Sequence, residues 1–340
     1  MANWESRDCN LFSLKNIGGR DPLPDTSDFL LRSHRMIVAS FRQPGMGSFV
    51  GARISDTELV DLSPLIPGLN SSISAMRQLL KVTEGRPHFG PGELHGLRRV
   101  RIEDVVLQPV VPDPTKIVAA PVNYRDHQEE MSEDYGIEAL GVFLKAPSSV
   151  LGHGGVVQLP YTDRRFDQEG ELAAVIGRTA RGVTVSDALD VVAGYTCCLD
   201  MTMRGGEDRS TRKSFDSFTP VGPYLVTPDE VGDVATLQLR TTVNGVLRQD
   251  TDIADLIWDV PQLVSYASSV MTLYPGDIVT TGTPAGIGQI SDGDVVTVGI
   301  DRVGELSVSV SAAGAVACPT RGAQRGPTPP SDITPVRRRD

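Results

Sequence analysis

Two glutamates one residue apart, Glu169 and Glu171, are the residues of this chain with the clearest chemical potential. They open a run that becomes apolar and β-branched over residues 172–177, which is typical of a β-strand. Because side chains alternate across a strand, both carboxylates should project from one face, with their Cα atoms roughly 6 to 7 Å apart. Two anions so placed need a cation, although an isolated pair of this kind could also line a solvated face of a sheet.

A third carboxylate can join this pair. A second apolar run, residues 191–199, ends in Asp200, and a neighbouring strand could bring that side chain beside the two glutamates. Three hard oxygen ligands suit Mg²⁺, Mn²⁺ or Ca²⁺ better than zinc, which prefers His and Cys. The residues therefore favour a divalent-metal site, with Mg²⁺ as the first expectation.

Composition restricts the class of protein. The chain has 340 residues, of which 40% are hydrophobic, enough for one large or two ordinary domains. A formal net charge of -11 argues against a nucleic-acid surface, which needs a basic stripe. No apolar run approaches the ~20 residues of a membrane helix, the N-terminus lacks the order of a signal peptide, and the cysteines show no C-x-x-C spacing. We expect a soluble, cytoplasmic, reduced enzyme of small-molecule metabolism, with neither nucleic-acid nor membrane partners.

The segments that must position these carboxylates divide into a small and a large domain. Residues 1–34 mix charges, Gly and Pro without a period and are predicted to be an N-terminal arm. Residues 35–112 contain short β-type runs and form a small β-rich domain. A Pro-rich strip over residues 108–116 marks the boundary to the main domain, residues 113–312. The Pro-rich, finally basic tail, residues 313–340, is predicted to be disordered.

Local patterns predict several individual elements. The run SSISAMRQLLKV is a short amphipathic helix with Ser71 or Ser72 as its cap. In the main domain, TVSDALDVVAGY is a helix capped by Ser186, and DVPQLVSYASSVM is the clearest helix. Asn244-Gly245 between two strand-like runs predicts a tight hairpin. Together these patterns describe an α+β protein that is mostly β.

Seven motifs in order along residues 35–310 resemble the fumarylacetoacetate hydrolase superfamily, in the branch of acylpyruvate hydrolases and 2-hydroxyhepta-2,4-diene-1,7-dioate isomerases. They are NYRDH with Glu130, FLKAPSS, the E-x-E-L strand, LDMTMR, RKSFDSFTPVGP, VNG, and PGDIVTTGTPAGIG before a DGDVVTV strand. The resemblance implies a mixed β-roll catalytic domain with a small N-terminal β-rich domain, and a homodimer. It also implies that Glu169, Glu171 and Asp200 hold the metal.

The resemblance further assigns catalytic roles. His127 matches the general base, and Glu130, three residues on, would orient it or help it to activate water. His suits this role because its ordinary pKa, near 6.5, lies close to neutral pH. Lys213 would place a positive charge near the reacting carbonyl or carboxylate, or form a salt bridge to the metal carboxylates. A surface helix carrying an ion pair is the alternative for His127 and Glu130.

Substrate contacts follow from the same comparison of motifs. Arg204 could bind a substrate carboxylate as a fork, and Thr283 resembles a substrate-contacting Thr, although it could also pin a turn. Glu207 departs from the usual Gln, and in the cleft it would repel a second substrate carboxylate unless Arg204, Arg209 or Arg212 neutralises it. Arg212 also departs from the pattern, because it replaces the Gly that usually precedes Lys213.

Other residues near the motifs have no such role. His153 and Asp167 are expected to be structural. Gly282, Gly286 and Gly288 leave loop amides uncovered, but a phosphate-binding interpretation is weak because neither a Walker Lys-Ser/Thr nor a G-x-G-x-x-G helix start is present.

The leading functional prediction is a divalent-metal hydrolase that cleaves a carbon–carbon bond in an acylpyruvate or 1,3-dicarbonyl-like substrate. The metal would chelate the 2-oxo acid or diketone, and His127 and Glu130 would activate water. A 2-oxo acid decarboxylase or isomerase of aromatic-compound catabolism is the first alternative, since it would use the same residues. A non-catalytic, metal-stabilised binding protein is the second.

Overall fold

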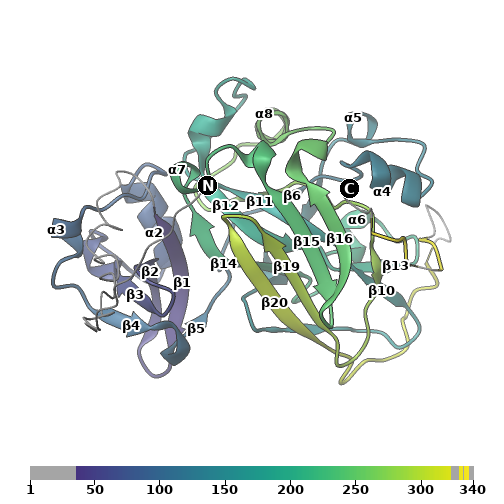
Figure 1. The fold of residues 1–340 in the computed structure, drawn as a ribbon, viewed down its shortest axis with the longest axis horizontal. Coiled ribbons are helices and arrows are strands. Elements are labelled where there is room, and N and C mark those ends of the chain that lie inside the picture. Colours follow the sequence, from purple (N-terminus) through teal and green to yellow (C-terminus); the bar gives the residue numbers. More distant parts are fainter. Residues whose placement is uncertain (1–35, 323–328, 332, 337–340) are drawn as a thin grey trace, which may run out of the picture.

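The computed structural model describes residues 36–322, 329–331 and 333–336, so the predicted N-terminal arm lies outside the described residues. The small N-terminal module stands at one end of the molecule, and the larger catalytic domain makes up the rest (Figure 1). One sheet runs through both, in the order β4-β3-β2-β1-β14-β12-β11-β17-β6-β7. The two parts meet where β1 (Ile37–Gln43) pairs antiparallel with β14 (Thr219–Val226).

The N-terminal module is a curled sheet with one main helix. Its other strands are β2 (Gly47–Arg53), β3 (Glu58–Asp61), β4 (Arg99–Arg101) and β5 (Val106–Leu107). Its helices are α2 (Ala75–Val82), as predicted, and the short α3 (Pro91–Leu94). The predicted cap of α2 is wrong. Ser74 caps the helix by accepting a hydrogen bond from the Arg77 amide, whereas Ser72 lies in a preceding turn held by the Asn70 side chain.

The catalytic domain packs a second sheet against the central one. The central strands are β12 (Val192–Leu199), β11 (Gly170–Ile176), β17 (Ile278–Thr280), β6 (Ile117–Ala119) and β7 (Phe143–Lys145), with β8 (Val150–Leu151) beside β14. The second sheet consists of β16 (Val246–Asp252), β15 (Gln238–Val243), β19 (Val295–Ile300), β20 (Gly304–Ser311) and β9 (Val156–Gln158). In Figure 1 its green and yellow strands cross in front of the central sheet. This mostly β, α+β architecture confirms the predicted fold class.

The strand that carries Glu171 is buried on both faces. Every residue of β11 is buried. Leu172 and Ala174 join the core between the two sheets, whereas Ala173 and Val175 join a core shared with the N-terminal module. This alternation is the period of a strand. The glutamates at its start are therefore held on a rigid, doubly covered element.

A third, small sheet and several short helices complete the domain. The sheet contains β13 (Thr202–Arg204), β10 (Arg165–Gln168) and β18 (Gly288–Gln289). The helices are α4 (Arg125–Glu130), α5 (Ile137–Leu140), α6 (Arg209–Arg212), α7 (Pro228–Val231) and α8 (Val260–Val270). No helix among the described residues is long and apolar enough to cross a membrane.

Two of the remaining local predictions are confirmed and one is wrong. Asn244 and Gly245 have φ of 52° and 76°, as a primed hairpin turn requires. Helix α8 starts at a capping box in which Asp259 and Gln262 satisfy each other's amides. Ser186, however, caps no α-helix. Its hydroxyl bonds within the loop, and only a single 3₁₀ turn, Ala188–Val191, follows.

Candidate metal centre and active site

The ends of β11 and β12 bring the predicted carboxylate triad together. These strands pair antiparallel, with Gly170 opposite Leu199, so the residues beside that pair, Glu169 and Asp200, become neighbours. The amide of Asp200 donates to the carbonyl of Glu169 over 2.8 Å. All three carboxylates are buried, and one oxygen from each of Glu169, Glu171 and Asp200 lies within 4.8 Å of the others. Glu169 itself stands between β10 and β11, where the single predicted strand is interrupted.

The electrostatics of the triad fit a divalent cation. Burial and the neighbouring charge of Asp200 raise the pKa of Glu171 to about 8. Burial also acts to raise the pKa of Glu169, but the positive charges of Lys213 and Arg204 outweigh it and hold that pKa well below its usual value. An all-oxygen set with this concentration of negative charge suits Mg²⁺, Mn²⁺ or Ca²⁺. The residues present therefore fit the metal that the sequence predicts.

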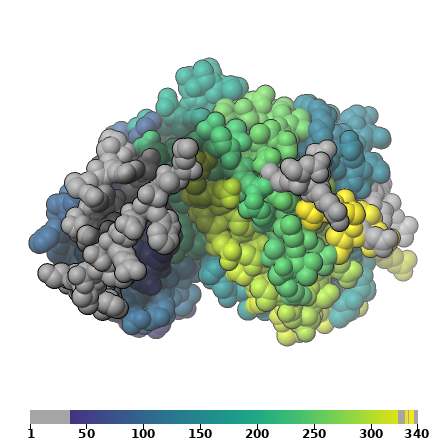
Figure 2. Space-filling model, viewed as in Figure 1, coloured from purple at the N-terminus to yellow at the C-terminus, as the bar shows by residue number. Residues whose placement is uncertain are grey.

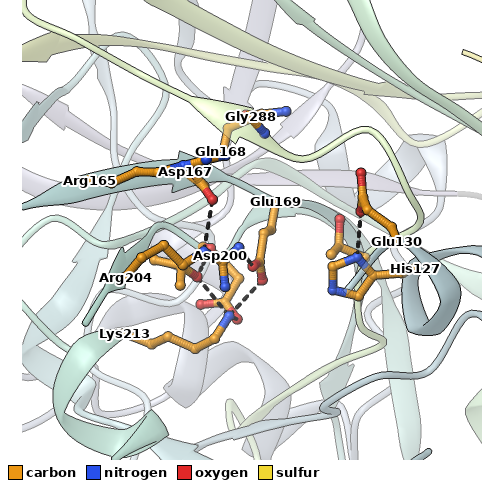
Figure 3. A network of polar contacts seen from close by, with 12 residues as sticks. His127, Glu130, Arg165, Asp167, Gln168, Glu169, Asp200, Arg204, Lys213 and Gly288 are labelled. Carbon is orange, nitrogen blue, oxygen red and sulfur yellow. Dashed lines mark hydrogen bonds and ion pairs between the residues drawn. The ribbon is translucent and has the colours of Figure 1, made fainter. Parts of the chain in front are cut away.

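Two buried lysines contact the triad. The Lys213 ammonium lies 2.6 Å from Glu169 Oε2 and 2.5 Å from Asp200 Oδ2, which is the salt bridge proposed as one of its two roles (Figure 3). Lys145, on β7, donates to Asp200 Oδ1 and to the Phe218 carbonyl. No role for Lys145 was predicted from the sequence. Its position after the apolar residues Phe143 and Leu144 was the available signal, because a fully buried lysine needs an acidic partner.

Arg204 is anchored by an aspartate that we expected to be only structural. Its Nε donates to Asp167 Oδ2 and its Nη2 to Glu169 Oε1, both over 2.7 Å (Figure 3). Asp167 also accepts from Arg165 Nε over 2.7 Å. Asp167 thus orients Arg204 against the triad, while Arg204 lines the cavity described below.

His127 and Glu130 form a pair across from the triad. They lie on the short helix α4, and His127 Nδ1 is 2.9 Å from Glu130 Oε2. Both side chains are buried, and the other Glu130 oxygen accepts from the Gly286 amide over 2.9 Å. Figure 3 shows Glu130 on one side of the His127 ring and the carboxylates on the other. Because Glu130 engages Nδ1, the Nε2 atom is the one available to a reactant in the cavity.

The glycine-rich loop supports these side chains with its amides. Gly282 donates to Glu171 Oε2 over 3.0 Å, and Gly288 donates to Gln168 Oε1 over 2.8 Å. With Gly286 bound to Glu130, all three glycine amides are engaged by protein, which leaves nothing for the phosphate-binding alternative. Thr283 lines the cavity, and its hydroxyl accepts from Gln249 over 2.7 Å.

A cavity of about 400 Å³ connects all of these groups. Its lining includes His127, Glu169, Glu171, Arg204, Lys213 and Thr283, together with Glu207, Arg209 and Arg212 from the segment after β13. Asp200 and Glu130 stand behind this lining and contact its members. All nine predicted site residues therefore meet at one place.

Glu207 reaches the cavity while contacting the C-terminal segment. Its Oε1 accepts from the Thr320 hydroxyl over 2.7 Å and lies 3.6 Å from Arg164 Nη2. Arg164 also donates to the Thr320 carbonyl, and Arg165 donates to the Pro330 carbonyl over 2.9 Å. Figure 2 shows residues of this yellow segment on the surface of the catalytic domain. The arginine that lies beside Glu207 is thus Arg164 rather than the predicted Arg204, Arg209 or Arg212.

Comparisons with known proteins agree with the geometry. Residues 116–311 match the family model described as fumarylacetoacetate (FAA) hydrolase C-terminal. Maleylpyruvate hydrolase of Aquipseudomonas alcaligenes is 40% identical over 291 residues, which cover 81% of this chain and 99% of that protein. A bifunctional isomerase/decarboxylase of 4-hydroxyphenylacetate degradation from Salmonella dublin is 42% identical over 56% of this chain and 45% of its own.

A solved structure of a relative shows the same likeness. The crystal structure of maleylpyruvate hydrolase from Sphingobium sp. SYK-6 in complex with manganese(II) and pyruvate superposes with a TM-score of 0.71 at 40% identity. The match covers 84% of this chain and 100% of that one. That relative binds a divalent metal and pyruvate, and the family resemblance drawn from the motifs is confirmed.

Proposed function

Because the chain belongs to the fumarylacetoacetate hydrolase family of enzymes, we propose that it is a divalent-metal-dependent acylpyruvate hydrolase. The single observation that carries the proposal is the arrangement of the cavity: the His127–Glu130 pair faces a buried triad of carboxylates across a space large enough for a small 2-oxo acid. The maleylpyruvate hydrolase relatives support the acylpyruvate as substrate class.

The reaction divides between the two sides of the cavity. His127 Nε2 removes a proton from water, which adds to the acyl carbonyl, and Glu130 at Nδ1 stabilises the imidazolium that forms. The bond between the acyl carbon and the pyruvate methylene then breaks, and the pyruvate enolate departs with the electron pair. Protonation of its carbon releases pyruvate and the free acid.

The positive groups stabilise the charge that develops. A divalent ion at Glu169, Glu171 and Asp200 would act as a Lewis acid for the 2-oxo acid and its enolate. Lys213 and Arg204 add fixed positive charge in a site from which most water is excluded, where such charge is most effective. We propose Mg²⁺ as the ion, with Mn²⁺ or Ca²⁺ as substitutes.

Replacement of His127 by Ala tests the assignment. Loss of the general base should lower kcat about 10²- to 10⁴-fold, while Mn²⁺ affinity, measured by calorimetry, stays unchanged. Hydrolysis of acylpyruvates is followed by their ultraviolet absorbance and by one pyruvate released per bond cleaved. Activity close to that of wild type, or loss of metal binding in this variant, would contradict the assignment.

The same assay, extended to other 2-oxo acids, distinguishes two alternative functions. The isomerase/decarboxylase relative favours a decarboxylase or isomerase as the second candidate. Release of CO₂ from oxaloacetate by the Mg²⁺-loaded enzyme, without hydrolysis of acylpyruvates, would establish a decarboxylase. Absence of turnover across a panel of 2-oxo acids would favour a metal-stabilised binding protein.

We also propose a homodimer in the cytoplasm. The support is a set of exposed apolar side chains on two elements that pack against each other, Leu189 on the 3₁₀ turn Ala188–Val191 and Tyr266 and Val270 on α8. Light scattering coupled to size-exclusion chromatography tests the assembly. A mass of one chain at micromolar concentration would contradict it.

A further inference from the structure

The arginines of β13 and of the segment that follows it differ in whether a carboxylate of the protein neutralises them. Arg204, at the end of β13, donates to Asp167 and Glu169. Arg209 lies 3.4 Å from Glu133. Arg212 lines the same cavity, yet its guanidinium forms no ion pair with any residue that the structure describes. Its Nη1 is buried and has no hydrogen-bond partner among those residues.

A buried guanidinium nitrogen without a hydrogen-bond partner is costly for the folded protein. Burial and the adjacent charge of Arg204 lower the pKa of Arg212 to about 10, so the group still carries its charge at neutral pH. A buried polar atom without a hydrogen bond costs free energy, and a buried charge without a partner costs more. The nearest acids cannot relieve this cost, because Glu169 already pairs with Arg204 and Lys213.

The surroundings select an anion as the missing partner. A guanidinium offers only donors, in a fork that matches a carboxylate. The charge of Glu207, on the same segment, is offset by Arg164 at 3.6 Å. A ligand carboxylate near Arg212 would thus meet a free cation and a neutralised glutamate. Arg212 lies immediately before Lys213, so the anion it binds belongs to a molecule already held at the triad.

We propose that Arg212 is a specificity-determining residue that binds a second carboxylate at the far end of the substrate's acyl chain. The inference rests on the proposed function, in that the triad end of the cavity takes the 2-oxo acid. The preferred substrates are then acylpyruvates whose acyl group ends in a carboxylate. Neutral acyl chains leave Arg212 unpartnered and react less efficiently.

Kinetics with a matched pair of substrates test the role of Arg212. Succinylpyruvate and butanoylpyruvate have acyl chains of equal length and differ in the terminal carboxylate. In Arg212→Gln, kcat/KM for succinylpyruvate should fall roughly 10- to 100-fold, the value of a hydrogen-bonded charge pair. The value for butanoylpyruvate should change less than about threefold. Arg212→Lys, which keeps the charge but loses the fork, should fall between wild type and Arg212→Gln.

A control and a binding measurement complete the test. Arg125→Gln removes an equal charge from an exposed arginine that pairs with Glu138 outside the cavity, and should leave both substrates unchanged. Affinities of the Mn²⁺-loaded protein for 2-oxoadipate and 2-oxohexanoate, two inert probes of equal length, should differ in wild type and converge in Arg212→Gln.

Two results would overturn the proposal. Equal losses for both substrates in Arg212→Gln would make Arg212 a structural residue. If wild type bound the two probes with equal affinity, there would be no site for a second carboxylate. Failure of the proposed function is a different result: wild type would hydrolyse neither acylpyruvate, while the probe affinities would still report on Arg212.

Discussion

The two walls of the cavity are built in different ways. The metal wall, formed by Glu169, Glu171 and Asp200, stands on the ends of β11 and β12, which are buried throughout. Each of its carboxylates contacts a lysine, an arginine or a backbone amide. A second wall, residues 205–212, is a short irregular segment with one four-residue helix.

The polar atoms of the two walls differ as well. In the 205–212 segment, Arg212 Nη1 and Glu207 Oε2 are buried without hydrogen-bond partners among the described residues. The metal wall contributes no carboxylate oxygen to that set. The metal wall is held in place by protein contacts, which suits it to stabilise the negative charge that develops on the reacting group of every substrate. The second wall has polar atoms without partners, which suits it to bind the part of the substrate that differs from one substrate to the next. Substitutions on the two walls should therefore differ in whether they discriminate between substrates.

The largest effect is expected on the metal wall, from Glu171→Gln. The amide removes one anionic ligand without changing the shape of the side chain. Metal affinity and kcat/KM should both fall more than about 100-fold, beyond the 10- to 100-fold typical of groups that only support a ligand. Calorimetry with Mn²⁺ and assays on succinylpyruvate and butanoylpyruvate measure this. If kcat/KM fell for only one of the two substrates, the metal wall would also discriminate between substrates, and the proposed difference between the walls would be contradicted.

Lys145→Met should show how strongly the metal wall depends on its buried partners. Asp200 would lose a fully buried cation, and breaking a buried ion pair from one side costs about 3 to 5 kcal/mol. Urea unfolding of the metal-free protein measures the free energy of unfolding. Added Mn²⁺ should restore part of the loss, because it supplies positive charge beside Asp200. A variant as stable as wild type without metal would contradict this account.

The pH dependence of metal binding follows from Glu171. Its pKa in the folded protein, about 8, lies above the ordinary value of 4.5. The stability that Glu171 contributes to the metal-free protein is therefore fully present below pH 4.5 and is lost as pH rises through about 8. A metal ion must displace this proton, and its apparent affinity should rise about tenfold per pH unit up to about pH 8. Thermal unfolding with and without Mn²⁺ measures the effect. In Glu171→Gln, the part of the metal affinity that depends on pH through this carboxyl should be lost. If Mn²⁺ raised the unfolding temperature of wild type by the same amount at every pH, the account would be contradicted.

The smallest effect is expected from Glu207→Gln, on the wall formed by residues 205–212. Removing a negative charge that Arg164 already offsets should raise kcat/KM for succinylpyruvate relative to butanoylpyruvate by only about 2- to 5-fold. Arg212→Gln should lower the same ratio of kcat/KM values, so the two variants are expected to change the preference for a terminal carboxylate in opposite directions. A fall in this ratio would place Glu207 among groups that bind the substrate directly.

Local patterns predicted the elements that depend on neighbouring residues. The hairpin at Asn244-Gly245, helix α8 and the buried strand after Glu171 all follow from spacing and turn chemistry over short distances. Errors arose where several residues of one type competed. Ser74 rather than Ser71 or Ser72 caps α2, because backbone geometry at the turn decides which hydroxyl meets the free amides.

Contacts between distant segments escaped prediction. Asp167 holds Arg204 because β10 and β13 pair, and Lys145 reaches Asp200 from β7 across the central sheet. The neutralisation of Glu207 by Arg164 also joins separate parts of the chain. Each residue type was visible in the sequence, but its partner depends on strand pairing that no local pattern specifies.

The sequence by itself determined the carboxylate spacing of Glu169 and Glu171, the order of motifs that identifies the family, and the mostly β character of the chain, because these depend on residue type and on periodicity. Tertiary structure alone decided which cations stabilise the triad and which remain unmatched. Arg204 and Arg212 are the same type of residue, yet packing gives Arg204 two carboxylates and leaves Nη1 of Arg212 without a partner in the described structure. The physical reason is that ion pairing requires contact, and contact between distant residues is set by the fold.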